Sequence, residues 1–491
     1  MLYNYISEIA ERFFVNVCIS LKSKEVFFVK KTYSRIIAGI LAAASLTALS
    51  ACSDSSSDGG SGSADATTES TTEKTEWTGD NIEVTVAEDA VSSDINIEGQ
   101  TLKWMGFYDL NPTNDNPERS TEVALFEDTY GAKIEYVQTT NSTQFDDLAT
   151  AILGGQSPDI FVYDWRSFPY DINKGQYQPI DSIVDWTDPM WADVKDQADM
   201  FTWKGEHYVA PFGYGFNDFQ ILMYNRNTVE DLGLDDPYEL YEEGKWDWDV
   251  FVDMMKTFTG GDESLYGISG WWANAFVYTS GDTLVKYDGT NFTNNLYSSQ
   301  VERAQHVIQD IWTSGLVKRG WVGPEAAFVS NDCLFYSMGT WAYQGAAGAV
   351  PDDYIQVVPF PKDPNSDTYY MNKRIFSHMW VKGSENADCV KAWFNVNRLV
   401  NYDEQYKDIT KQKFLTNNQN WPEEIYDIVM SYYDDDKFTL AYDYGYGLSD
   451  YMNSEVMTLL YEGLVNEQFE SWEQAREEVM NIVDSEIANY N

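Results

Sequence analysis

The chain contains 491 residues, of which 43% are apolar and 15% aromatic, so it is long enough for two or three domains with substantial cores. Acidic residues outnumber basic ones by 79 to 32, which gives a net charge of −47 at pH 7. This charge excludes a surface that attracts nucleic acid, and the ordinary apolar fraction excludes general disorder.

Residues 30–52 have the layout of a secretory signal. Basic residues within 30–35 precede an apolar run, Ile36–Leu49, and small residues lead to Cys52. The run is shorter than the roughly 20 residues of a spanning helix, which favours a cleaved leader. Leu49-Ser50-Ala51-Cys52 resembles the bacterial lipobox, in which the cysteine is acylated and becomes the first mature residue. The alternative is an ordinary signal peptide with a chance cysteine. We therefore expect a lipoprotein signal peptide at 30–51 and lipidation of Cys52.

The segments on either side of this leader are not expected to join the fold. Residues 1–29 mix charged and apolar residues, and we interpret them as a mis-assigned start or a long n-region. Residues 52–99 form a flexible acidic linker, because their Ser/Thr/Gly-rich part, Ser53–Glu76, has no aromatic residue to bury.

Strands and helices alternate from residue 100 onward. The pattern predicts strands at 101–108, 133–138 and 160–163, with helices at 120–130 and 143–153 between them. This order favours a parallel α/β sheet. Ligands of such sheets lie beyond the carboxyl ends of the strands. That rule places five residues at a rim: Phe107, Tyr108, Asp109, Asp164 and Trp165.

The later elements continue the alternation. We expect a hairpin at 203–211, strands at 221–225, 354–359 and 376–381, and helices at 247–257, 301–314, 387–400 and 471–488. Residues 326–342 read as a helix followed by a strand.

The cysteines and histidines predict no metal site and no cofactor. Cys333 and Cys389 lie in the folded part, where either a disulfide between them or two buried thiols is compatible with the sequence. No Cys or His pair has zinc spacing. His378 is expected to be a structural histidine.

Several motifs together resemble those of the maltose-binding-protein-like family of extracellular sugar-binding lipoproteins. Beside the lipobox they are, in chain order, LATAILGGQSPD (148–159), GQYQPI (175–180), KGEHYVAP (204–211), ILMYN (221–225), MGTWA (338–342), VVPFP (357–361) and the stretch 379–400. Each motif is weak alone, but their order and spacing are specific.

The resemblance implies an α/β, two-lobed periplasmic-binding-protein-like fold of type II, in which each lobe is a mixed sheet flanked by helices and a hinge joins the lobes. Lobe one would comprise residues 100–212 plus 356–435, and lobe two residues 213–355 plus 436–491. It further implies a monomer, lipid-anchored to the outer face of the bacterial membrane through Cys52. The protein would capture a carbohydrate, an oligosaccharide, in the interlobe cleft and deliver it to the permease subunits of an ABC importer.

Sugars present apolar C–H faces and many hydroxyls, so their binding sites combine aromatic platforms with carboxylates and amides. Each candidate is weighed against a role in core packing or capping. The expected ligand-binding residues are Trp341, Trp271, Trp272, Asp164, Trp165, Tyr108, Asp109, Tyr214, Asn217 and Tyr444.

Three other functions remain open from the sequence. A secreted glycoside hydrolase would use the same residue types, but 79 acids make carboxylate pairs unavoidable and therefore uninformative. A carbohydrate-adhesion module is opposed by the alternation of strands and helices, and a non-sugar solute fits the same fold. We expect no enzymatic activity and no catalytic residue.

Overall fold

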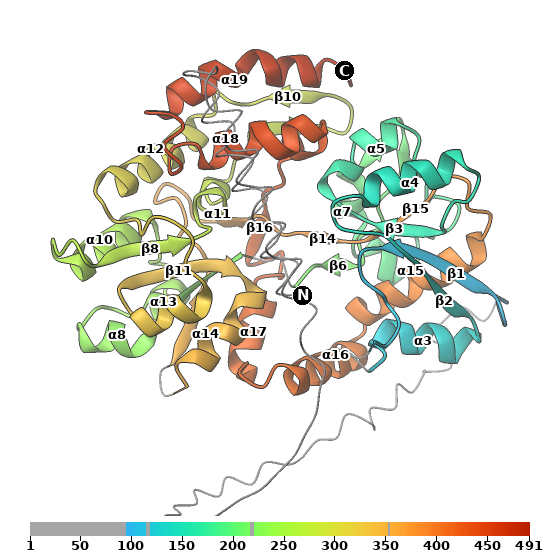
Figure 1. Cartoon of the computed structure of the whole chain (residues 1–491), viewed down its shortest axis with the longest axis horizontal. Helices are drawn as coiled ribbons and strands as arrows, with labels where there is room; N and C mark the ends of the chain where they lie inside the picture. The colour runs from blue at the N-terminus through green and yellow to red at the C-terminus, as the bar shows by residue number, and fades with distance from the viewer. Residues whose placement is uncertain (1–94, 114–117, 217–219, 352–353) are drawn as a thin grey trace, which may run out of the picture. The chain divides into compact units, whose positions relative to one another are not determined.

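The computed structural model of this chain describes residues 95–491 apart from 114–117, 217–219 and 352–353. The expected signal peptide, Cys52, most of the linker and Asn217 lie outside the described residues. The main helices and strands are labelled in Figure 1.

The first sheet has four strands in the order β15-β3-β1-β2. They are β1 (Thr101–Gly106), β2 (Lys133–Gln138), β3 (Ile160–Val162) and β15 (His378–Trp380). β1 pairs parallel with both β2 and β3, whereas β15 is antiparallel to β3. The parallel β1–β3 core predicted from the strand–helix alternation is confirmed.

Helices α3 (Thr121–Tyr130) and α4 (Gln144–Leu153) form the crossovers between these strands. α3 ends at Gly131, whose backbone has φ of 62° and donates its N–H to the carbonyl of Glu127. A residue with a Cβ is disfavoured in this left-handed conformation, so glycine stops the helix here. On the buried face of α3, Phe126 meets Trp393 of α15 (Ala387–Tyr402) edge to face at 5.4 Å.

The second sheet also has four strands, in the order β12-β7-β11-β8. They are β7 (Gln220–Asn225), β8 (Tyr266–Gly270), β11 (Cys333–Gly339) and β12 (Ile355–Val358). β8 and β11 are parallel, whereas β7 is antiparallel to both β11 and β12. The second sheet is therefore mixed.

The remaining elements are short strands and the helices around the two sheets. The strands are β4 (Thr202–Trp203), β5 (Glu206–His207), β6 (Gly213–Tyr214), β9 (Val285–Tyr287), β10 (Phe292–Asn294), β13 (Tyr369–Met371), β14 (Ile375–Phe376) and β16 (Phe438–Leu440). The helices are η2 (Trp165–Ser167), α5 (Tyr170–Asn173), α6 (Pro189–Ala192), α7 (Lys195–Asp199), α8 (Arg226–Asp231), α9 (Pro237–Glu242), α10 (Trp248–Thr259), α11 (Ala273–Tyr278), α12 (Ser299–Thr313), α13 (Pro324–Ser330), η3 (Thr340–Ala342), α14 (Tyr343–Ala349), α16 (Glu404–Asn417), α17 (Glu423–Ser431), η4 (Tyr444–Gly447), η5 (Met452–Val456), α18 (Met457–Glu462) and α19 (Trp472–Ile487).

Two chain segments connect the sheets and pair with each other. The chain passes from β3 to β7 through β6, and it returns from β12 to β15 through β14. β6 and β14 form a two-stranded antiparallel ribbon with Ile375 opposite Tyr214. We call this pair the crossing ribbon.

Two elements lie with the second sheet although the expected division of the chain put residues 356–435 in lobe one. β12 pairs with β7, so that Val358 lies opposite Leu222. Ile425 and Val429 of α17 share a core cluster with Ile221 of β7. β12 follows β11 through η3 and α14, and both strands pair antiparallel with β7, so the chain completes the second sheet before it crosses back.

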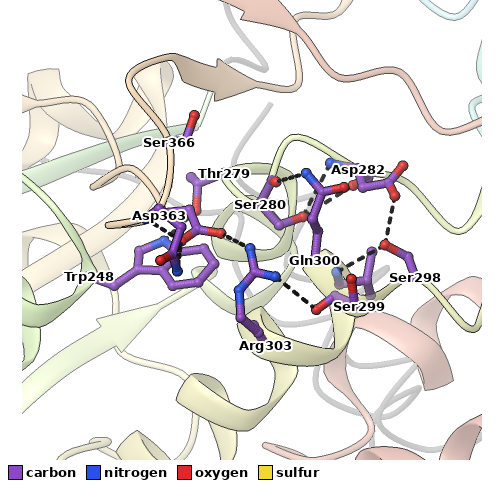
Figure 2. A network of polar contacts seen from close by, with 12 residues as sticks. Trp248, Thr279, Ser280, Asp282, Ser298, Ser299, Gln300, Arg303, Asp363 and Ser366 are labelled. Carbon is purple, nitrogen blue, oxygen red and sulfur yellow. Dashed lines mark hydrogen bonds and ion pairs between the residues drawn. The ribbon is translucent and has the colours of Figure 1, made fainter.

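A polar network fastens the start of α12 to its neighbours (Figure 2). The Arg303 guanidinium pairs with the buried carboxylate of Asp363. The Ser298 hydroxyl caps α12 through the Val301 N–H and donates to the Asp282 carboxylate at 2.6 Å. These bonds hold α12 against the segments at 279–282 and 363–366, all within the second-sheet region.

An aromatic seam joins the segment after β3 to the segment around η4. It consists of Tyr163, Phe168, Phe201, Tyr442 and Tyr444, all of them buried. The hydroxyls of Tyr163 and Tyr442 share a hydrogen bond at 2.7 Å. The rings of Phe201 and Tyr442 meet edge to face at 5.1 Å, and those of Phe168 and Tyr444 at 6.0 Å. The first-sheet and second-sheet regions therefore share buried aromatic surface as well as the crossing ribbon.

Cys333 and Cys389 are free thiols, which settles the two possibilities left open by the sequence. Burial raises the pKa of the Cys389 thiol to about 11, so it stays protonated at neutral pH. Among the described helices, none has the length and apolar character that crossing a membrane requires.

Candidate functional site

Three exposed tryptophans follow three parallel chain segments of the second-sheet region. Trp271 follows β8, and Trp341 lies in η3 directly after β11. A third segment pairs parallel with β8 through Val317 and Ile268, and Trp321 follows it. The exposed fractions are 41% for Trp271, 38% for Trp341 and 51% for Trp321. Because parallel segments end at the same edge of a sheet, the three indoles lie at one edge.

The backbone of Trp271 is held rigidly at this edge. Its N–H donates to the carbonyl of Ser337 at 2.8 Å, and its carbonyl accepts from the Ser337 hydroxyl. Gly270 makes this approach possible, because it has φ of 84° and a Cβ there would lie 2.0 Å from the Ser337 carbonyl oxygen. These contacts fix the backbone from which the Trp271 ring projects. The centroid of this ring lies 6.2 Å from that of the Trp321 ring.

Two side-chain amides adjoin the tryptophans. The Gln220 amide donates to the carbonyl of Trp271 and to the side-chain oxygen of Asn274, both at 3.1 Å. Uncharged donors and acceptors beside flat indoles suit a ligand with hydroxyls and apolar C–H faces. We call Trp271, Trp321 and Trp341 with Gln220 and Asn274 the tryptophan edge.

Trp272 points the other way from Trp271. Its exposed fraction is 3%, and its ring packs against Phe276 within the core. Trp272 sits at the N-terminal end of α11, where the chain turns from strand into helix. The turn brings one indole to the surface and sends the next one inward.

On the first sheet, Phe107 and Tyr108 follow β1. Phe107 is exposed, and its ring meets the half-buried ring of Tyr108 edge to face at 5.1 Å. The Trp104 indole N–H donates to the carbonyl of Tyr108 at 2.9 Å. Asp109 accepts two hydrogen bonds from Asn111, one from its backbone N–H and one from its side chain, both at 2.9 Å. Asp109 therefore shapes the loop after β1.

Asp164 and Trp165 follow β3 and begin η2. The Asp164 side chain accepts the N–H of Arg166 at 3.3 Å and lies 4.0 Å from the Arg374 guanidinium. Trp165 is half-buried, with its ring 5.0 Å from that of Tyr442 and 5.5 Å from that of Tyr446. Asp164 thus caps η2 as well as facing a cation.

Tyr214 and Tyr444 lie where the two sheet regions meet. Tyr214 belongs to the crossing ribbon and donates its hydroxyl to Asp435 at 2.9 Å. Burial and, after it, the charge of Asp435 raise the pKa of Tyr214, so the phenol remains a donor at neutral pH. Tyr444 is buried in the aromatic seam and donates to the carbonyl of Met200 at 3.1 Å.

One group of side chains in the described residues has ligand atoms close enough to share a metal ion. Glu302, His306 and Glu473 bring one such atom each within 4.8 Å of the others. Their polar atoms already have partners, because His306 bonds to Glu473 at 2.8 Å and Arg476 pairs with Glu302 at 2.9 Å. The Arg476 guanidinium also disfavours a metal cation here, so this cluster is a network of polar contacts between α12 and α19.

Sequence reasoning missed three members of the tryptophan edge: Trp321, Gln220 and Asn274. A signal for Trp321 was present, because it lies between two glycines in Arg319-Gly320-Trp321-Val322-Gly323, and Gly320 has φ of 83°. A tryptophan in such a glycine-bounded loop is poorly placed for a core. Gln220 carried no signal, because its contacts depend on the position of β8.

The chain matches the family model described as bacterial extracellular solute-binding protein over residues 115–397, more than half of its length. Among curated proteins, none matches the sequence.

Several solved structures share the fold at low sequence identity. The cyclic α-maltosyl-1,6-maltose binding protein of Arthrobacter globiformis is 15% identical, with a TM-score of 0.61 over 80% of this chain and 100% of that one. An ABC substrate-binding protein of Listeria monocytogenes in complex with cycloalternan is 16% identical, with a TM-score of 0.57 over 79% of this chain and 99% of that one. The galacto-N-biose-/lacto-N-biose I-binding protein of Bifidobacterium longum is 13% identical, with a TM-score of 0.54 over 82% of this chain and 99% of that one.

The predicted fold is confirmed: the molecule has the two-lobed type II architecture, with one mixed α/β sheet in each lobe. Lobe one contains the first sheet and lobe two contains the second sheet. The crossing ribbon connects the lobes. The chain belongs to the family of bacterial extracellular solute-binding proteins.

Proposed function

We propose that this protein captures an uncharged oligosaccharide between its lobes and delivers it, chemically unchanged, to the permease subunits of an ABC importer. The observation that carries the proposal is the tryptophan edge, where three exposed indoles and two amides stand at one end of the second sheet. Exposed indoles pack against the C–H faces of sugar rings at a low desolvation cost, and amides form hydrogen bonds with the hydroxyls.

Lobe one contributes the opposing residues in this proposal. Phe107, Tyr108 and Asp109 follow β1, and Asp164 and Trp165 follow β3, so all five stand at the carboxyl ends of parallel strands. Closure of the lobes around the sugar would require only that the closed arrangement makes more contacts with the ligand.

The oligosaccharides named for the similar structures support this ligand class. The Listeria protein is in complex with cycloalternan, and the Arthrobacter protein binds cyclic α-maltosyl-1,6-maltose. We extend the class, not the individual sugar, to this chain. The proposal also includes a monomer held at the outer face of the membrane by a lipid on Cys52, because residues 30–52 have the layout of a lipoprotein signal.

The test is a thermal-shift screen of the purified protein with linear and cyclic α-glucans and with lacto-N-biose, followed by calorimetry with the best ligand. We expect Trp341→Ala and Trp321→Ala each to weaken binding about tenfold or more, which corresponds to about 1.4 kcal/mol. The melting temperature should change little, because both indoles are exposed.

The matched control is Trp312→Ala, which removes a half-buried tryptophan of α12 from outside the tryptophan edge. Unchanged affinity in both edge variants would contradict the proposal. Chromatography of the sugar after incubation distinguishes a hydrolase, which would release shorter products.

A further inference from the structure

The two strands of the crossing ribbon meet a single carboxylate, that of Asp435. Tyr214 of β6 donates its hydroxyl to Asp435 at 2.9 Å. Lys373, two residues before β14, places its ammonium on the same carboxylate. One side chain thus contacts two of the segments through which the chain passes between the lobes; a third passage runs through α16, between α15 and α17.

Lys373 depends on this contact. Its side chain is fully buried, whereas that of Asp435 is half exposed. The ammonium also reaches the carbonyl of Tyr433 at 3.5 Å and lies 4.9 Å from the centre of the Tyr214 ring. A buried cation without its anion is strongly destabilising, so Asp435 is required beside Lys373 in this arrangement.

Asp435 itself belongs to lobe two. It lies in the turn between α17 and β16, and Val429 and Phe438 on either side of it join the core cluster of β7 and β12. Tyr433, two residues before Asp435, stacks on Tyr214, with the two ring centroids 5.7 Å apart. The turn is therefore anchored to the second sheet before it touches the crossing ribbon.

A third contact runs directly from Asp435 to lobe one. The Gln197 amide of α7 donates to Asp435 at 2.8 Å and to the hydroxyl of Tyr214 at 3.1 Å. α7 follows a segment whose Trp191 and Val194 lie in the core cluster of the first sheet. Gln197 therefore moves with lobe one, and its bond to Asp435 spans the two lobes.

We infer that Asp435 is a positioning residue that sets the relative arrangement of the lobes, by holding both strands of the crossing ribbon and Gln197 on one carboxylate. A rotation about the ribbon changes the distance between Gln197 and Asp435, because each moves with a different lobe. It changes the distance between Lys373 and Asp435 less, because Lys373 lies within the crossing segment. The Gln197–Asp435 bond therefore favours the arrangement in this structure over others.

The test measures the distance between the lobes in the ligand-free full chain. Spin labels carried by unnatural side chains at positions 153 and 329 report this distance, because Leu153 ends α4 in lobe one, Val329 lies in α13 of lobe two, and both are exposed. In Gln197→Ala, we expect the population with the spacing of this structure to fall about two- to tenfold relative to other spacings, as for the loss of one hydrogen bond. The melting temperature should change little.

The control is Gln412→Ala, which shortens an exposed glutamine on α16 and should leave the distance distribution unchanged. A distribution in Gln197→Ala that matches the wild type would overturn the inference. A second pair of variants distinguishes the loss of the Lys373–Asp435 ion pair from a general loss of negative charge in the turn. Asp435→Asn should both lower the melting temperature and change the distribution, whereas Asp436→Asn, one residue away, should do neither; equal effects of the two would also overturn it.

The inference rests on the two-lobed solute-binding role but not on the identity of the ligand. The distance measurement contains no ligand, so a failed sugar screen would leave its result unaffected. If the proposed function holds, Gln197→Ala should in addition change the ligand affinity while Trp271, Trp321 and Trp341 remain in place. An unchanged affinity with a changed distance distribution would show that the arrangement set by Asp435 has no influence on binding.

Discussion

Adjacent residues with the same side chain can have opposite roles in this molecule. Trp271 stands at the surface because the left-handed Gly270 aims the chain along Ser337, and Trp272 turns inward as α11 begins. The sequence predicted both as ligand contacts, because two neighbouring tryptophans cannot be distinguished by residue type or by local pattern. Only the place where the strand becomes a helix separates them.

His378 is a buried histidine whose protonation is resisted by its surroundings. Its Nδ1 accepts the Trp393 indole N–H at 2.8 Å, and the aromatic rings of Trp104 and Phe212 surround it. Burial lowers the pKa of His378 to about 3, from an ordinary value of about 6.5. The expectation of a structural histidine agrees with this environment.

The pH dependence of folding should reveal this histidine. Between pH 6.5 and 3 the unfolded chain binds a proton at His378 that the folded protein does not, so stability falls as the pH falls through this range. From pH 7 to pH 5 this one group lowers the free energy of unfolding by about 2 kcal/mol. In His378→Asn, whose side-chain oxygen can still accept from Trp393, we expect that part of the loss to disappear. Urea unfolding at both pH values measures it, and equal losses in variant and wild type would contradict the assignment.

At the scale of elements, the sequence predicted the helices with a clear apolar stripe. α10 begins and ends within two residues of the expected positions, because its buried residues recur at helical spacing and a glycine follows it. α3 also matches its expected bounds, although four consecutive residues, Val123–Phe126, are buried; there Ser120 and Gly131 mark the ends. α16 was not predicted. Its buried residues are only Tyr406 and Ile409, so a mostly polar sequence conceals its period.

The aromatic seam could not be predicted from local pattern either. The loop 442–447 has the tyrosines and glycines of a mobile loop, and it was expected to contact ligand through Tyr444. In the structure this loop packs against Phe168 and Phe201, which lie far away in the sequence. Non-local packing of this kind leaves no periodic signal, so the contact emerges only from the fold.

Gly447, which lies against the backbone of Phe168 in the aromatic seam, should be less replaceable than the nearby Gly445. A Cβ there would lie 1.9 Å from the carbonyl oxygen of Phe168 and 2.9 Å from that of Trp165, so two backbone segments would have to separate. We expect Gly447→Ala to destabilise the protein by about 1–3 kcal/mol or more. At Gly445 a Cβ meets mainly the flexible side chain of Met457, so Gly445→Ala should cost less. Thermal unfolding of the two variants checks this order, and a reversed order would contradict the close backbone packing.

At the scale of the whole molecule, the family and the two-lobed fold were both predicted from the order of weak motifs, and both are confirmed. The expected lobe boundaries differ from the sheet pairing, because β12 pairs with β7, which lies far away in the sequence, and such non-local pairing leaves no signal in the local pattern. The site residues and the lipid anchor remain predictions.

The anchor can be tested on the intact cell. If a lipid on Cys52 holds the protein, Cys52→Ser should prevent incorporation of labelled palmitate, because serine lacks the thiol that carries the lipid. Wild-type protein carried through the same labelling is the control. Serine-variant protein that still incorporates labelled palmitate would contradict the anchor.

The tryptophan edge draws its three indoles from three separate connections, at 271, 321 and 341. The strands beneath them pair through backbone bonds that do not depend on these side chains. Substitutions can therefore replace one of the three tryptophans, or lengthen one connection, without disturbing the sheet or the other two tryptophans. For the proposed oligosaccharide site, a change of ligand would need changes in a single connection, and close variants of this chain should diverge at these three positions before they diverge in the sheet.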